Sequence, residues 1–87
     1  MVSVASSQPI VTAMQLGMLL KTTRKRRKLT QAWVAGRLGL SQNRVSHLEL
    51  HPEELSLHQL LSWSAALGLE LKLGERENTE SMGSTEW

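Results

Sequence analysis

Residues 31–50 constrain the fold more than any other part of the chain. They contain a small residue, Ala35, followed four positions later by Gly39, and then two apolar residues, Val45 and Leu48. Two helices joined by a tight turn need a small side chain where they cross and a residue that tolerates positive φ in the turn. Val45 and Leu48 lie on one face of the second helix, because residues three apart are neighbours there. This spacing predicts two short helices that cross closely at a turn.

Further helices are predicted on both sides of this pair. Thr12 and Gln15 fit a capping box, which predicts a helix down to about Arg27. Caps at Thr30 and Ser41 predict helices over residues 31–38 and 42–50. A further short helix is expected to start at residue 53 or 54, and a last helix to run over about residues 56–67. The predicted domain covers residues 12–74, between a flexible arm (1–11) and a disordered acidic tail (75–87).

One strand is predicted after the last helix. Apolar and charged residues alternate strictly there, as is typical of a half-buried strand: Leu69, Glu70, Leu71, Lys72 and Leu73. A lone strand cannot satisfy its own backbone, and the sequence offers no second strand. We therefore expect two copies of the chain to pair their strands across a two-fold axis. The predicted fold class is all-α: a five-helix, repressor-like domain with one C-terminal strand that pairs across a homodimer.

Charge is distributed unevenly along the chain. The net charge is only +2, but residues 1–74 hold nine Lys and Arg against four Glu, and residues 75–87 hold one Arg against four Glu. The domain is therefore +5 and the tail −3, which indicates two surfaces with different partners. Six basic residues lie between Lys21 and Lys28 with no acidic residue among them. Such a patch attracts a polyanion, although an ordinary solvated helix face has the same appearance.

The sequence gives little support to several other classes of protein. There is no Cys for a disulfide or a Cys-based zinc site, and no run of apolar residues long enough to span a membrane. No nucleophile–base pair or glycine-rich phosphate loop is present, so we expect no enzymatic activity and no cofactor. His47 and His51 have the spacing of a helical metal-binding pair, but no third ligand is evident and we predict no metal. Trp33 and Trp63 are expected in the core or at the dimer interface.

The outward face of the second helix in residues 31–50 is polar. Its side chains can form hydrogen bonds with base edges in a DNA major groove, and we predict base contacts for Ser41, Gln42, Asn43, Arg44 and His47. Predicted phosphate contacts are Lys25, Arg26, Arg27, Lys28, Thr30 and Arg37. An amphipathic basic helix also suits an anionic membrane, but the neighbouring helix-turn-helix pattern favours DNA.

Residues 20–69 resemble the phage repressor and Cro-like (XRE) helix-turn-helix family. The motifs that carry the resemblance are Arg24, Leu29-Thr30-Gln31, Ala35 with Gly39, Ser41-Gln42, and Glu49. The resemblance implies that Arg24 and Glu49 form a structural ion pair between the first and third helices. It also implies that Gln31 contacts phosphate and braces Gln42.

Within that family the chain is similar to HipB-type antitoxins. Glu49-Leu50-His51-Pro52 resembles their Glu-x-x-Pro motif, and residues 69–73 correspond to their dimerisation strand. The acidic tail closes in Glu86-Trp87, and a terminal Trp is a suitable anchor for a partner's pocket. The resemblance implies that this tail contacts a HipA-type serine/threonine kinase toxin.

Three features depart from the family pattern. Lys28 and His51 stand where Gly is usual, and Lys in a positive-φ conformation costs about 1 kcal/mol relative to Gly. Asn43 and Arg44 are atypical of the group, so the operator sequence does not transfer.

The sequence therefore predicts a cytoplasmic, nucleoid-associated bacterial repressor. It would bind a palindromic operator in double-stranded DNA as a homodimer and regulate its own toxin–antitoxin operon. The alternatives are a stand-alone transcriptional regulator without a toxin, and a module that binds a partner protein without DNA.

Overall fold

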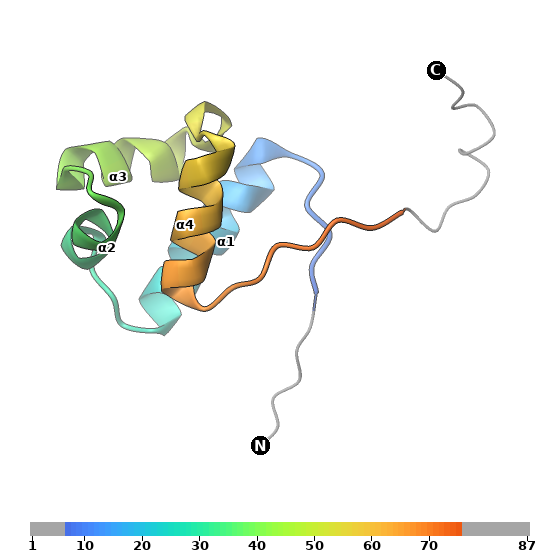
Figure 1. Cartoon of the computed structure of the whole chain (residues 1–87), viewed down its shortest axis with the longest axis horizontal. Coiled ribbons are helices and arrows are strands. Elements are labelled where there is room, and N and C mark those ends of the chain that lie inside the picture. The colour runs from blue at the N-terminus through green and yellow to red at the C-terminus, as the bar shows by residue number, and fades with distance from the viewer. Residues whose placement is uncertain (1–6, 76–87) are drawn as a thin grey trace.

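The structure, a computed structural model, describes residues 7–75 of the chain. Its elements are α1 (Ala13–Arg26), α2 (Gln31–Leu38), α3 (Gln42–Leu50), the short 3-10 helix η1 (Pro52–Glu54) and α4 (Leu57–Leu67). Figure 1 shows α2 and α3 together on one side of the α1–α4 pair, while the segments before α1 and after α4 run toward the other side. The pair α2–α3 is therefore presented at one end of the described structure, away from the segments before α1 and after α4.

The helix ends follow from local sequence. Thr12 forms the expected capping box, because its hydroxyl accepts from the Gln15 amide at 3.1 Å and the Gln15 side chain accepts from the Thr12 amide at 3.0 Å. Gly39 and Gly68 end α2 and α4 in the left-handed conformation, with φ of 72° and 77°. The predicted capping box at Thr12 and the positive φ expected at Gly39 are confirmed.

The core is centred on Trp63 of α4, which is completely buried. Around it lie aliphatic residues from all four α-helices: Leu20, Val34, Ala35, Val45, Leu48 and Leu67. Trp63 is thus a core residue, one of the two roles expected for it. Trp33 is different, since it lies on α2 with 37% of its surface exposed.

A close approach fixes the C-terminal end of α3 on α1. A Cβ atom added at Gly17 would lie 2.7 Å from the Glu49 carbonyl oxygen and 2.9 Å from Pro52 Cγ. Both distances are shorter than normal van der Waals contact, so only glycine allows the chain to pass here. Pro52 itself is buried in this contact.

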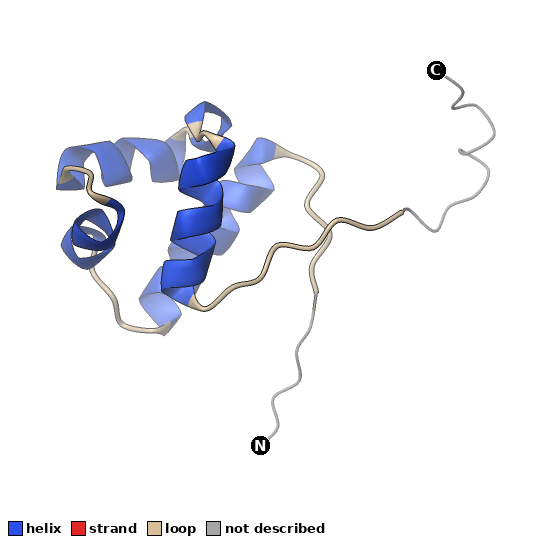
Figure 2. Ribbon diagram, viewed as in Figure 1, coloured by secondary structure: helices blue, strands red, loops and turns tan. Residues whose placement is uncertain are grey.

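Two expectations differ from the structure. The short helix expected from residue 53 or 54 is the 3-10 turn η1, so the fold has four α-helices and not five within the described residues. Residues 69–75 form no regular secondary structure, and Figure 2 shows only helices and loops in the described chain. A strand needs a partner for its backbone hydrogen bonds, and the structure describes one copy of the chain. Strand pairing across a dimer stays a prediction.

Candidate DNA-binding surface

Helix α3 has one buried face and one exposed face. Val45, Leu48 and Glu49 point into the protein, and the Ser41 hydroxyl caps the helix by accepting from the Arg44 amide at 3.0 Å. The side chains expected to contact bases lie on the other face: Ser41, Gln42, Asn43 and Arg44 are exposed, and His47 is partly exposed. The packing of α3 against the core therefore leaves this polar row open to a partner.

A buried ion pair holds α3 in place. Arg24 Nε lies 2.7 Å from Glu49 Oε2 and Arg24 Nη2 lies 3.2 Å from Glu49 Oε1, so the guanidinium grips both carboxylate oxygens. Arg24 Nη1 also donates to the Leu29 carbonyl at 3.0 Å, and Gln31 Nε2 donates to Glu49 Oε1 at 3.0 Å. This network joins the end of α1, the start of α2 and the end of α3. The Arg24 side chain therefore has a structural role, because its guanidinium donates to Glu49 and to the Leu29 carbonyl.

Gln31 is placed differently from the family expectation. Its amide donates to Glu49, and no hydrogen bond joins it to Gln42 among the described residues. Both glutamines nevertheless line the same surface hollow. Gln31 thus contributes to the site by bracing the ion pair beneath it.

The hollow is open and basic, with a volume of about 590 Å³. On α1 and just after it, Lys21, Lys25 and Lys28 line it with Arg24, at the i, i+3, i+4, i+7 spacing of one helix face. The remaining lining residues surround the N-terminus of α2 and the start of α3: Leu29, Thr30, Gln31 and Gln42. The N-terminus of a helix carries partial positive charge and free N–H groups. The hollow is therefore electropositive and has donors suited to an anion such as phosphate.

The Lys28 side chain lines this hollow, and its backbone is strained. Its φ is 60°, the left-handed region where family members commonly have Gly. Its amide donates to the Lys25 carbonyl at 2.9 Å, in the turn that ends α1. His51, the other position usually occupied by Gly, has φ of −129° and carries no such strain.

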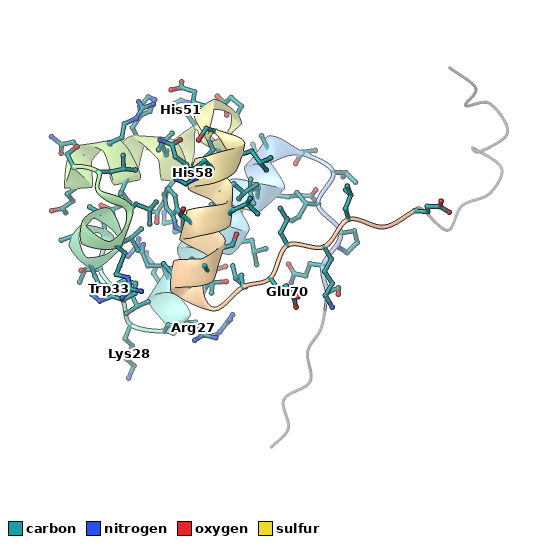
Figure 3. The ribbon with its side chains drawn as sticks, viewed as in Figure 1. Arg27, Lys28, Trp33, His51, His58 and Glu70 are labelled. Atoms are coloured by element: carbon teal, nitrogen blue, oxygen red, sulfur yellow. The ribbon has the colours of Figure 1, made fainter. Side chains whose placement is uncertain are left out.

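The remaining arginines of the basic run lie elsewhere. Arg26 lines a second hollow beside Pro9, Ile10 and Met18. The Arg27 guanidinium lies against Gly68, because a Cβ atom there would be 3.1 Å from its Cζ atom, and Figure 3 shows this side chain below the end of α4. Consecutive residues of a helix point about 100° apart. The basic run therefore contributes to three separate surfaces: the basic hollow, the hollow beside Pro9, and the contact with Gly68. The structure does not bring Arg26 and Arg27 to the basic hollow.

Arg37 lies on α2, with its guanidinium 5.2 Å from the centre of the Trp33 ring. This is the geometry of a cation–π contact, and it orients an exposed arginine beside an exposed indole. Arg37 does not line the basic hollow.

Sequence reasoning missed Glu54, which contacts two expected base-reading residues. His47 Nε2 lies 2.8 Å from Glu54 Oε1, and Arg44 Nη1 lies 3.9 Å from the same oxygen. The hydrogen bond from His47 lowers the pKa of the Glu54 carboxyl. The signal in the sequence was Pro52, since the 3-10 turn it starts brings Glu54 back along α3. Glu54 therefore contacts two of the side chains that we predict to bind bases.

The comparisons with known proteins agree with this geometry. Residues 15–50 match the family described as a helix-turn-helix domain. A chain in the structure of a HipA–HipB–O2–O3 complex is similar, with a TM-score of 0.74 and 25% sequence identity. An MDT protein is similar with the same two values, and each match covers 82% of this chain and 100% of that one. No curated protein matches the sequence.

These matches, together with the exposed α3 and the basic hollow beside it, define residues 15–50 as a DNA-binding helix-turn-helix domain. The similarity to a chain of the HipA–HipB–O2–O3 complex extends beyond this domain, over 82% of the chain. No helix within residues 7–75 has the length and apolar character needed to cross a membrane.

Proposed function

We propose that the chain is a dimeric operator-binding repressor that regulates its own operon. The observation that carries the proposal is the exposed polar face of α3 beside the basic hollow, with both held by the buried Arg24–Glu49 pair. In a helix-turn-helix protein the second helix enters the major groove by its N-terminal residues. Phosphates on the groove edge would then meet the hollow.

The roles follow from position. Gln42 reads a base, and adenine is the base that suits a bidentate amide contact, while Arg44 reads guanine or holds a phosphate. Further base contacts are assigned to Ser41, Asn43 and His47. Phosphate contacts are assigned to Lys21, Lys25, Lys28, Thr30 and Gln31, with Arg37 at the far end of α2. Lys21 joins this set because it lines the hollow.

The test is DNA affinity with the promoter region of the chain's own operon. Gln42→Ala should weaken operator binding by about 1–3 kcal/mol and change binding to random DNA of equal length much less. Fluorescence anisotropy at fixed salt measures both affinities. An equal reduction on the two DNAs would refute base reading by Gln42.

Dimerisation is proposed through residues 69–73. Support comes from the alternation of exposed Leu71 and Leu73 with the charged residues Glu70 and Lys72. Two recognition helices related by a two-fold axis would enter successive major grooves about 34 Å apart. Leu71→Ser should shift the sedimentation equilibrium toward monomer, whereas Lys72→Ser, on the other face of the strand, should not. Equal behaviour of the two variants would contradict the strand register.

A HipA-type kinase toxin is proposed as the protein partner. Support comes from the similarity to a chain in a HipA–HipB complex, which covers most of this chain. We assign the contact to the acidic tail and its last residues, Glu86 and Trp87, which lie outside the described residues. Trp87→Ala should weaken co-purification with a kinase-like protein encoded beside this gene, and Trp87→Phe should restore part of it. Unchanged capture by Trp87→Ala would exclude the tail anchor.

A further inference from the structure

Four potential metal ligands gather where α3 ends. They come from a stretch of eight residues and lie on the surface: His47, His51, Glu53 and Glu54. One ligand atom from each of His51, Glu53 and Glu54 lies within 4.8 Å of the other two. His47 joins them through its 2.8 Å contact with Glu54, and its ring centre is 4.6 Å from that of His51. The third ligand that the sequence did not reveal is supplied by η1.

The backbone under this cluster is fixed. Pro52 is buried against α1 at Gly17, where no Cβ atom fits. The turn is closed by hydrogen bonds from the Glu54 amide to the His51 carbonyl and from the Leu55 amide to the Pro52 carbonyl, both at 3.0 Å. The four side chains therefore project from a fixed frame, while their exposed ends are free to change rotamer.

The donor set suits a particular class of ion. Two imidazoles and two carboxylates are ligands that Zn²⁺ and similar divalent transition metals accept, and Zn²⁺ prefers four of them in a tetrahedron. With Zn–N and Zn–O distances of about 2.1 Å, neighbouring ligand atoms lie about 3.4 Å apart. The ligand atoms of His51, Glu53 and Glu54 are up to 4.8 Å apart. To reach the metal-bound spacing, these distances must shorten by about the length of one C–C bond. Exposed side chains reach that by rotamer adjustment.

We propose that His47, His51, Glu53 and Glu54 form a binding site for Zn²⁺ or a chemically similar divalent transition metal. Binding releases His47 from its hydrogen bond with Glu54 and commits its imidazole to the metal. Arg44, which lies 3.9 Å from Glu54, moves away as the cation takes its place.

The site shares His47 with the proposed DNA-reading face, and this coupling rests on the proposed function. A metal-bound His47 cannot contact a base. The added positive charge strengthens binding to all DNA alike, so it cancels in the ratio of operator to random affinity. We therefore expect Zn²⁺ to lower that ratio. Linkage then requires Zn²⁺ to bind the chain on operator DNA more weakly than the chain on random DNA, by the same factor.

Metal binding without DNA tests the site. The full, tag-free chain is titrated with Zn²⁺ by calorimetry, and Co²⁺ absorption reports the ligand geometry. We expect one ion per chain with micromolar or tighter affinity. His51→Ala and Glu54→Gln should each weaken binding by about tenfold or more. His58→Ala is the matched control, because His58 is an exposed histidine on α4, apart from His51 in Figure 3.

Two outcomes overturn the metal site: millimolar affinity in the unaltered chain, or a weakening in His58→Ala equal to that in His51→Ala. Circular dichroism of each variant separates removal of a ligand from unfolding. The coupling is tested separately by operator and random affinities with and without Zn²⁺. Tight Zn²⁺ binding with an unchanged ratio of operator to random affinity would refute the coupling but not the metal site. Absence of operator binding without metal would refute the proposed function alone.

Discussion

Removal of the Arg24 side chain should destabilise the domain strongly. The Glu49 carboxylate is only 2% exposed, and Arg24→Ala removes two of the three hydrogen bonds that it receives here. Removing one partner from a buried ion pair costs about 3–5 kcal/mol, because the remaining charge stays buried without compensation. A domain of this size has a free energy of unfolding of roughly 4–10 kcal/mol. We therefore expect Arg24→Ala to remove about half of the stability.

Urea denaturation followed by circular dichroism measures this change. The protein concentration is held fixed, because the proposed dimerisation would link stability to concentration. Arg26→Ala is the matched control. It removes an exposed arginine from the same helix and should change the free energy of unfolding by less than about 0.5 kcal/mol.

A double variant tests the reason for this destabilisation. Arg24→Met with Glu49→Leu removes both charges and keeps similar volume, so its stability should lie within about 1–2 kcal/mol of the unaltered protein. It should be more stable than Arg24→Ala alone. If Arg24→Ala costs under about 1 kcal/mol, or if the double variant is the least stable of the three, the buried pair is not what holds α3.

Two further predictions concern the basic hollow. Lys25→Ala should reduce the slope of log affinity against log salt concentration by about 0.9 for each phosphate that the chain no longer neutralises, while Arg26→Ala should leave the slope unchanged; equal slopes for the two variants would show that Lys25 does not bind phosphate. Lys28→Gly should raise the free energy of unfolding by about 0.5–1 kcal/mol by relieving the left-handed strain, yet weaken DNA binding because a charge leaves the hollow. Urea denaturation and anisotropy separate the two effects, and a destabilised Lys28→Gly would contradict the strain argument.

Local signals made the helices predictable. Thr12, Thr30, Ser41 and Ser56 each cap a helix through their own side chain, and Gly39 and Gly68 each end one. Such effects act within three or four residues, so the sequence contains all the information that they require. The predicted strand over residues 69–73 differs, because its backbone hydrogen bonds would have to come from a second chain.

The candidate site was less predictable because it depends on angles around a helix. Seven positions separate Lys21 from Lys28, and the basic residues between them differ in direction by about 100° per step. The composition of the run indicates an anion-binding surface, but only the three-dimensional placement of α1 shows that Lys25 reaches it and Arg26 does not. The contact of Glu54 with His47 was not predicted for a related reason. It depends on a proline-initiated 3-10 turn that is seated against Gly17, more than thirty residues earlier in the chain. A functional surface formed by such a distant contact is fixed by packing, and local patterns in the sequence do not contain it.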